Sequence, residues 1–467
     1  MKYISTRGGG QPQNFETVLL AGMAPDGGLY VPESWPSVDI SALKGKPYSE
    51  VAFAVMYPFV GACIPADDFK EMVEQTYAGA TFRHKDVVPL HHLKDNIYIM
   101  ELFHGPTIAF KDIALQLLGR LFDYVLKQRK ERITIVGATS GDTGSAAIEG
   151  CKACEQADMF ILHPRGRVSD VQRKQMTTID APNVYNIAVD GSFDDCQNMV
   201  KAMFADEEFR GAINLSAINS INWARIMAQI VYYYTSALSL GAPDKSISYV
   251  VPTGNFGDIF AAYSAQKMGL PIKSLCVASN KNDILTRFFE SGTMHIDKSY
   301  QTLSPSMDIQ ISSNFERYLF DLLGRNAERL NSVMNSFKEN GTFAVSEEHL
   351  QKARAQFTAS RADDKTTLAL IKEVYNTTDY ILDPHTAVGM EGVKTLAKEL
   401  GADEPVALLA TAHPAKFPDA VEDAIGLRPP LPEHLADLFD REEILSELPN
   451  DLPSVMDYVR TRTKTMN

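Results

Sequence analysis

Cysteine is scarce in this chain: there are five among 467 residues, and they are scattered along the sequence. Extracellular folds that depend on disulfides need closely spaced cysteines, so this scarcity excludes a disulfide framework and predicts a reducing, cytoplasmic location. Cys151 and Cys154 form a CxxC pair, but no second pair and no HxxxH motif lies at a spacing suited to structural zinc. We therefore expect no metal site.

Long apolar runs and an excess of positive charge are also lacking. No run of about 18 apolar residues occurs, which predicts that no helix crosses a membrane. The opening residues, MKYISTRGGGQPQNF, lack the apolar segment of a secretory signal. The net charge of −14 argues against a nucleic-acid or anionic-membrane partner, although a few local donors can still bind an anionic small molecule.

Hydrophobic residues are plentiful at 45%, so the chain can bury large cores, and its length suits two or three domains. Short β-branched runs alternate with amphipathic stretches from about residue 130 onward. Because near-continuous apolar strands between helices are typical of buried parallel sheets, the pattern predicts an α/β fold with parallel sheets covered on both faces. The predicted strands are 133–137, 159–163, 185–189, 248–251, 274–278 and 407–410, and the predicted helices include 193–205, 223–238, 259–268 and 386–400.

Three regions follow from these patterns. Residues 1–85 have turn signals and irregular spacing, which predict an N-terminal cap region. Residues 86–225 are expected to form a smaller α/β domain. Residues 226–467 are expected to form a larger α/β domain with a mainly helical insertion at about 281–380.

Lys111 lies in the run His-Gly-Pro-Thr-Ile-Ala-Phe-Lys-Asp at 104–112, before a helical pattern over 113–128. Its neighbours Phe110 and Ile113 are apolar, so desolvation and the helix dipole are expected to disfavour its cationic form. A lysine in that setting can form a Schiff base with a carbonyl substrate or with pyridoxal phosphate. The alternative is a lysine at a loop–helix junction that extends its ammonium into water.

Residues 138–145, Ala-Thr-Ser-Gly-Asp-Thr-Gly-Ser, follow a predicted strand and precede a helical pattern. Small residues let a ligand approach the backbone, and amides at a helix start bind anions. The hydroxyl groups of Thr139, Ser140 and Thr143 add donors. The alternative is a turn kept only for packing.

Two further loops follow predicted strands. Pro252–Asp258, Pro-Thr-Gly-Asn-Phe-Gly-Asp, is suited to a phosphate held by successive amides, although Asp258 can equally be a helix cap. Thr411 comes where the strand 407–410 ends, which is where α/β folds place ligand-binding residues, and its hydroxyl could contact a ring nitrogen. His413 and Lys416, in the same loop, are as readily structural. Together these loops and Lys111 have the parts needed to hold pyridoxal phosphate.

Five motifs occur in order along the chain: HGPTIAFKD at 104–112, SGDTGSAA at 140–147, NSINWARI at 219–226, PTGNFGD at 252–258 and TAHPAKFPDA at 411–420. Together they resemble those of the threonine synthase family, which are fold-type II pyridoxal-phosphate enzymes with a tryptophan synthase β-like fold. The opening residues 2–32 and ISSNFERY at 311–318 resemble the longer branch of that family, found in proteobacteria and fungi.

The resemblance implies a role for each matching residue. Lys111 matches the Schiff-base lysine, and Thr411 matches the residue that faces the pyridine nitrogen. Asp142 falls where related enzymes often have an Asn bonded to the cofactor's phenolic oxygen, and an ionised carboxylate cannot donate that bond. The cofactor-phosphate loop is matched by Gly254, Asn255, Phe256, Gly257 and Asp258. The residues that bind the substrate carboxylate in the family are matched by Thr139 and Ser140. Those that bind the substrate phosphate are matched by Thr143, Ser220 and Arg225.

The implied activity is the conversion of O-phospho-L-homoserine and water to L-threonine and phosphate by γ-elimination and β-addition of water. Arg225 could hold the phosphate with its planar fork, or it could be a helix-surface arginine. One alternative is a phospho-lyase that gives 2-oxobutyrate, phosphate and ammonia. A non-enzymatic alternative is a regulatory protein that binds phosphate or a nucleotide. We expect a monomer or homodimer.

Overall fold

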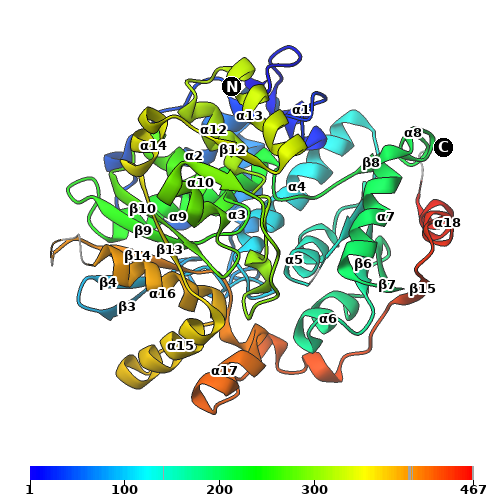
Figure 1. Ribbon diagram of the computed structural model, residues 1–467. Coiled ribbons are helices and arrows are strands. Elements are labelled where there is room, and N and C mark those ends of the chain that lie inside the picture. The colour runs from blue at the N-terminus through cyan, green and yellow to red at the C-terminus, as the bar shows by residue number, and fades with distance from the viewer. Residues whose placement is uncertain (140, 398–400, 402, 465–467) are drawn as a thin grey trace. The chain divides into compact units, whose positions relative to one another are not determined.

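The computed structural model describes residues 1–467 except 140, 398–400, 402 and 465–467 (Figure 1). Contacts between Cα atoms divide the chain into two compact units. Unit 1 comprises Met1–Val18, Met23–His104 and Ser220–Pro429, and unit 2 comprises Leu19–Gly22, Gly105–Asn219 and Pro430–Asn467. Among the residues that are described, no helix is long and apolar enough to cross a membrane.

This division differs from the predicted one in two respects. The predicted cap region belongs almost entirely to unit 1 and does not stand apart from it. Of the predicted smaller domain, residues 86–104 and 220–225 belong to unit 1, and Pro430–Asn467 joins the remainder in unit 2. The physical reason is strand pairing across long stretches of sequence, since β4 (Ile97–Glu101) pairs with β14 (Val406–Ala410) and β15 (Ser446–Pro449) pairs with β7 (Val184–Asp190).

Unit 1 contains a six-stranded sheet in the order β13-β10-β9-β14-β4-β3. All neighbouring pairs are parallel except β3 with β4, which form an antiparallel pair at one edge. The remaining strands of this sheet are β3 (Leu90–Lys94), β9 (Ile247–Pro252), β10 (Ile272–Ser279) and β13 (Phe357–Arg361). β13 lies within the region predicted as a mainly helical insertion, so that region also contributes an edge strand.

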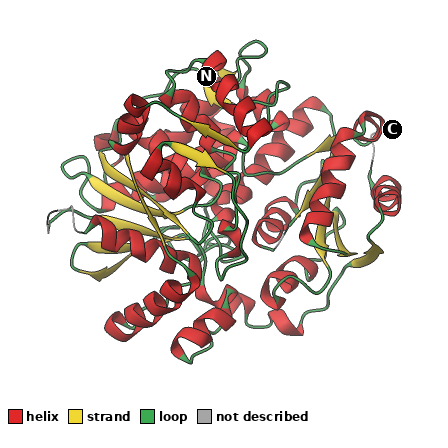
Figure 2. Ribbon diagram, in the orientation of Figure 1, coloured by secondary structure: helices red, strands yellow, loops and turns green. Residues whose placement is uncertain are grey.

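Helices surround the unit 1 sheet and appear red beside the yellow strands in Figure 2. In the first 85 residues these are α1 (Phe15–Ala21), α2 (Tyr48–Val60) and α3 (Ala66–Thr76), with the strands β1 (Tyr3–Ser5) and β2 (Tyr30–Pro32). Later helices are α9 (Trp223–Ser239), α10 (Gly257–Lys267), α11 (Ile284–Ser291), α12 (Phe315–Leu322), α13 (Ala327–Asn340), α14 (Glu347–Arg354), α15 (Asp364–Thr378), α16 (Pro384–Leu396) and α17 (Pro418–Ile425), with β11 (Thr293–His295) and β12 (Thr342–Ala344) forming a small antiparallel pair.

Aromatic packing explains why the N-terminal region is part of unit 1. Trp223, at the start of α9, is fully buried. Its ring centroid lies 5.9 Å from that of Tyr3 in β1 and 5.5 Å from that of Phe59 in α2. Because large buried rings contribute much of the burial energy of a core, these contacts join the cap region to the helices of the sheet domain.

Unit 2 contains a five-stranded sheet in the order β15-β7-β6-β5-β8, and every neighbouring pair is parallel. β6 (Ala157–Pro164) is buried at all eight positions, as expected for a strand covered on both faces. The other strands are β5 (Ile133–Ala138), β7 (Val184–Asp190) and β8 (Leu215–Ser216). The helices are α4 (Lys111–Arg129), α5 (Asp142–Cys151), α6 (Asp170–Thr177), α7 (Phe193–Ala205), α8 (Glu207–Ala212) and α18 (Leu452–Arg462).

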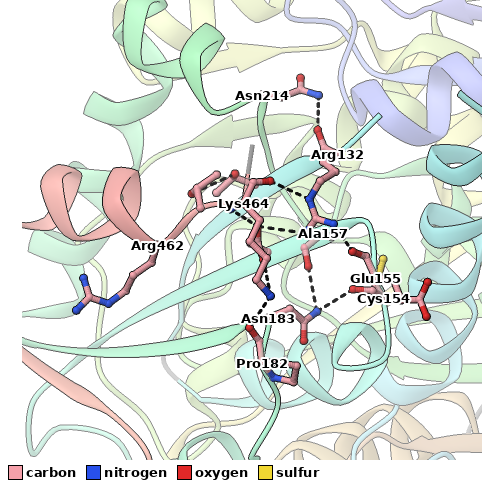
Figure 3. Close-up of polar contacts among 12 residues, drawn as sticks. Arg132, Cys154, Glu155, Ala157, Pro182, Asn183, Asn214, Arg462 and Lys464 are labelled. Atoms are coloured by element: carbon pink, nitrogen blue, oxygen red, sulfur yellow. Dashed lines mark hydrogen bonds and ion pairs between the residues drawn. The ribbon is translucent and has the colours of Figure 1, made fainter. Parts of the chain in front are cut away.

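The C-terminal segment is fastened to unit 2 by polar contacts, several of which are drawn in Figure 3. Arg132 donates from Nε to the Lys464 carbonyl at 2.8 Å, and the Lys464 ammonium donates to the Pro182 carbonyl at 3.0 Å. The neighbouring Asn183 donates to the carbonyl of Ala157 at 3.0 Å. The first two bonds join the residues just before β5 and β7 to Lys464, which follows α18, so this residue helps to hold unit 2 together.

A pair of glycines lets α4 and α5 cross with their backbones in contact. A Cβ atom on Gly119 would lie 1.9 Å from the carbonyl oxygen of Gly150, and one on Gly150 would lie 2.3 Å from the carbonyl oxygen of Leu115. No side chain fits in that space. Since Lys111 and Asp142 are the first residues of these two helices, the crossing also fixes the distance between them.

Gly119→Ala is therefore expected to lower the free energy of unfolding by about 1–3 kcal/mol, because the helices must separate to accept one methyl group. Gly211→Ala is the matched control: Gly211 lies in α8 of the same unit, and a Cβ there meets nothing within 4 Å. We expect that variant to be unchanged or stabilised by up to about 1 kcal/mol. Urea unfolding of both variants measures the difference, and equal stabilities would contradict the proposed close crossing.

Candidate active site

Lys111 is the first residue of α4 and its side chain is nearly buried, with a relative exposure of 8% for the residue. The loop before it is held rigidly. Asp112 is fully buried and accepts hydrogen bonds from the main-chain N–H of Thr107 at 2.8 Å and from its hydroxyl at 2.7 Å. The carboxylate of Asp112 thus stabilises the turn that places Lys111 at the start of α4.

The surroundings of Lys111 are less apolar than the sequence predicts. Its ammonium lies 5.5 Å from the ring centroid of Phe110, as expected, but also 3.3 Å from Oδ2 of Asp142. A carboxylate at that distance favours the cationic form, against the effects of burial and of the helix dipole. Lys111 is therefore half of a buried ion pair, which the sequence did not indicate because 31 residues separate its members.

Asp142 begins α5, and both of its carboxylate oxygens have partners in unit 2. Oδ2 accepts from Lys111, and Oδ1 accepts from Nε2 of Gln172 at 2.9 Å. Gln172 lies in the first turn of α6 and is buried, with 6% exposure. Sequence reasoning missed Gln172, because nothing in its local pattern separates it from an ordinary polar helix residue.

The loop between β5 and α5 is shaped by Thr139. Its hydroxyl oxygen accepts from the amides of Gly141 at 3.0 Å and of Gly144 at 2.9 Å. Gly141 has φ of 138°, and a Cβ there would lie 2.6 Å from Gln172, so glycine is required at that position. Thr143 is partly exposed on the first turn of α5, whereas the predicted site residue Ser140 lies outside the described residues.

In unit 1 the loop between β9 and α10 is tightly built around two glycines. A Cβ on Gly254 would lie 3.0 Å from the carbonyl oxygen of Ser306, and one on Gly257 would lie 3.2 Å from the amide nitrogen of the Asn314 side chain. Phe256 is buried with φ of 61°, a left-handed conformation that turns the chain into α10. The half-exposed Asn255 stands between these residues.

Asp258 is neither a helix cap nor a side chain directed at that loop. Its Oδ1 accepts hydrogen bonds from the hydroxyl groups of Tyr232 and Tyr233, the latter at 2.7 Å, so it joins α10 to α9. Its Oδ2 is buried and has no hydrogen-bond partner in the part of the chain that is described. Burial raises the pKa of Asp258 to about 6, more than the two tyrosine hydroxyls lower it.

This pKa predicts a pH dependence of stability. The folded carboxyl holds its proton up to about pH 6, whereas the unfolded one loses it near 3.8, so the free energy of unfolding falls by about 3 kcal/mol between these values. Above about pH 6 this contribution of Asp258 to the free energy of unfolding is fully lost. Asp258→Asn should flatten this fall in urea unfolding series of the cofactor-free protein, while Asp67→Asn, on the exposed face of α3, should leave it intact. An unchanged slope in Asp258→Asn would contradict the assignment.

Arg225 lies in the first turn of α9 and is buried, with 3% exposure, so it is not a helix-surface arginine. Its Nε and Nη1 are buried and have no hydrogen-bond partner among the described residues. Burial lowers the pKa of the guanidinium to about 10. A buried cation with free donors is costly, and an anion bound against it would remove the cost.

The remaining predicted residues of unit 1 are placed as follows. Thr411 directly follows β14 and is nearly buried, at the strand end where it was expected. His413 accepts from the amide of Ala415 at 3.1 Å and so caps a short turn, and Lys416 is fully buried. Ser220 is half-buried in the segment that leads into α9.

Three family models match successive parts of the chain. The model "Threonine synthase N terminus" matches residues 2–77, "Pyridoxal-phosphate dependent enzyme" matches 86–336, and "Threonine synthase, C-terminal" matches 386–459. Among curated proteins, threonine synthase of Pseudomonas aeruginosa is 55% identical over 98% of this chain and 98% of its own. Threonine synthase of Schizosaccharomyces pombe is 46% identical over 91% of this chain and 90% of its own.

Solved structures agree over the whole chain. The crystal structure of threonine synthase from Brucella melitensis with pyridoxal phosphate bound is 53% identical and matches with a TM-score of 0.97, covering 100% of both chains. Threonine synthase from yeast is 42% identical and has a TM-score of 0.93, with 99% of this chain and 98% of that chain covered. The predicted fold-type II α/β class is thereby confirmed, and the chain belongs to the threonine synthase family.

Proposed function

We propose that this protein is a carbon–oxygen lyase that converts O-phospho-L-homoserine and water to L-threonine and phosphate, with pyridoxal 5'-phosphate as cofactor. The observation that carries the proposal is the buried Lys111 amine, held 3.3 Å from Asp142 at the start of α4. It stands in a chain that shares 55% identity with a threonine synthase along nearly its full length. The same relationship supports a place in amino-acid biosynthesis.

The residues present fit the cofactor. Lys111 offers a primary amine for a Schiff base, through which pyridoxal phosphate would withdraw electrons from the substrate carbons. The loop of Gly254, Asn255, Phe256 and Gly257 leads into α10, and its two glycines allow the close packing against Ser306 and Asn314 that a Cβ would disturb. Main-chain amides at the start of a helix are suited to binding a phosphate. Thr411 would accept or donate a hydrogen bond at the ring nitrogen. Because its hydroxyl is neutral, this bond would not give the ring nitrogen a full positive charge.

The side chains of the site have distinct tasks in this proposal. The Lys111 amine takes the proton from the α-carbon of the substrate, and Asp142 and Gln172 keep that amine in position. Arg225 binds the substrate phosphate with donors that otherwise have no acceptor in the described structure. Thr139, Ser140, Thr143 and Ser220 supply further donors for the two anionic groups of the substrate.

A product assay separates this function from the phospho-lyase alternative. Purified protein supplied with O-phosphohomoserine should release phosphate and threonine in equal amounts, whereas a phospho-lyase would release 2-oxobutyrate and ammonia. Borohydride treatment should remove the visible absorbance of the cofactor and add its reduced mass to the peptide that contains Lys111. A colourless protein indifferent to added pyridoxal phosphate would instead support the regulatory alternative.

We also propose a cytoplasmic location and a monomer or homodimer. No disulfide joins any of the five cysteines, and four of them are buried, which suits a reducing compartment. Size-exclusion chromatography with light scattering would give the oligomeric state directly.

A further inference from the structure

The segment Ser312–Arg317, before and in the first turn of α12, contacts two parts of unit 1 that are far away in the sequence. Ser312 donates from its hydroxyl to the carbonyl of Gly254 at 2.7 Å. Asn314 donates to the carbonyl of Asn255 from both its main-chain N–H and its side chain, each at 3.1 Å. The proposed cofactor-phosphate loop is therefore held from behind by its carbonyl groups.

Anchoring the carbonyls also orients the amides. In a trans peptide the C=O and the N–H of one unit point in opposite directions. With the carbonyls of Gly254 and Asn255 bound to the 312–314 segment, the N–H groups of Asn255 and Phe256 must point to the opposite side. These are the groups that a phosphate would accept from, so Ser312 and Asn314 determine where the anion can bind.

The same asparagine reaches the segment that leads to Arg225. Its side-chain nitrogen donates to the carbonyl of Ser220 at 3.2 Å as well as to that of Asn255. Asn314 occupies the residue before α12, a position at which asparagine normally caps its own helix, yet it forms no such cap. The hydrogen bonds of its side-chain nitrogen instead join the cofactor-phosphate loop to the segment that contains Ser220.

Arg317 fixes the orientation of that asparagine. It is fully buried and donates to Oδ1 of Asn314, to the Ile221 carbonyl at 2.6 Å and to the Tyr30 carbonyl at 2.9 Å. All three acceptors are neutral oxygens. Because its donation occupies Oδ1, the nitrogen end of the Asn314 amide must face Asn255 and Ser220.

We propose that Asn314 and Arg317 are positioning residues that hold the cofactor-phosphate loop and the Ser220–Arg225 segment in one fixed arrangement, so that binding of the cofactor phosphate and of the substrate phosphate depends on the same buried pair. The proposal rests on the function proposed above. It goes beyond that function because it proposes that two residues that contact neither phosphate determine how the two phosphate-binding segments are placed relative to each other.

The test compares two aldehydes that differ only in the phosphate. Cofactor-free full-length protein is titrated with pyridoxal phosphate and with pyridoxal, and binding is followed by absorbance. Asn314→Asp keeps the acceptor for Arg317 but replaces the donor that faces the two carbonyls. We expect its affinity for pyridoxal phosphate to fall by about 10- to 100-fold, since two hydrogen bonds are lost, with pyridoxal affinity nearly unchanged. The KM for O-phosphohomoserine should rise in the same variant.

Two further variants keep the test decisive. Ser312→Ala loses only the bond to Gly254 and should weaken pyridoxal phosphate binding by a few-fold, which remains measurable if Asn314→Asp folds poorly. Arg325→Lys is the matched control, because Arg325 also donates to carbonyls of the N-terminal strand region, those of Glu33 and Pro32, each at 2.6 Å. Arg325 contacts neither the cofactor-phosphate loop nor the Ser220–Arg225 segment. Its variant should therefore prefer pyridoxal phosphate over pyridoxal as strongly as the unsubstituted protein does.

The possible failures are distinguishable. If the unsubstituted protein binds pyridoxal phosphate no better than pyridoxal, the phosphate loop assigned under the proposed function is wrong. If it does prefer pyridoxal phosphate and Asn314→Asp and Ser312→Ala keep the same preference, the positioning role is wrong while the function stands. Loss of the preference in Arg325→Lys as well would show that general destabilisation explains the effect.

Discussion

Lys111→Ala is expected to yield a protein that folds, loses covalently bound cofactor and forms threonine at least about 10³-fold more slowly. The alanine cannot form a Schiff base and cannot carry the proton of the α-carbon, and general acid–base groups contribute about 10²–10⁴-fold by themselves. Absorbance of the bound cofactor, its reduction by borohydride and a threonine assay together measure the loss. The fold should survive, because twelve other residues of α4 are buried besides Lys111.

Lys127→Ala is the control for this variant, since Lys127 lies on the same helix and its side chain is 45% exposed, paired with Asp123 and Glu155. Exposed ion pairs contribute little to stability, so this change should leave colour and turnover unaltered. Normal turnover in Lys111→Ala would mean that another amine is the nucleophile. A colourless Lys127→Ala would mean that the two lysines cannot be told apart by this assay.

The sequence was a good guide wherever a structural feature is local. Each predicted strand lies within an observed one, because the run of apolar residues that defines a buried parallel strand is contiguous. The loops at 138–145 and 252–258 were found for the same reason: a strand, a glycine-rich turn and a helix start are neighbours in the chain. Helix α7 (Phe193–Ala205) was predicted to the residue, since Ser192 and Asp195 form a capping box at its start.

Features that depend on distant residues were beyond sequence reasoning. The partner of Lys111 is a carboxylate 31 residues away, and the carboxylate of Asp258 is bound by tyrosines of the preceding helix. Nothing in ISSNFERY distinguishes a buried arginine from an exposed one, although Arg317 is fully buried. The division into compact units was likewise not visible in the sequence, because β15 pairs with β7 across more than half of the chain.

Arg225→Met is expected to have two large effects of opposite sign. In the protein without ligands, Nε and Nη1 of this buried guanidinium have no acceptor among the described residues, so replacing it by an apolar side chain of similar length should raise the free energy of unfolding by about 1–3 kcal/mol. With substrate, the loss of two charge-assisted hydrogen bonds should lower kcat/KM for O-phosphohomoserine by about 10²–10³-fold. A merely structural arginine would show destabilisation with any loss of activity.

Inorganic phosphate separates these causes further. It should raise the midpoint of unfolding of the unsubstituted protein, because a ligand that binds only the folded state stabilises it, and it should have no effect through this site in Arg225→Met. Arg329→Met, on the exposed face of α13, provides the same change of side chain without a buried charge and should keep both the phosphate response and kcat/KM.

If Arg225→Met is less stable than the unsubstituted protein, the guanidinium of Arg225 has a structural partner and the substrate phosphate must be bound elsewhere. If it is more stable yet inactive, the donors of Arg225 are retained at a cost in stability because the substrate phosphate needs them.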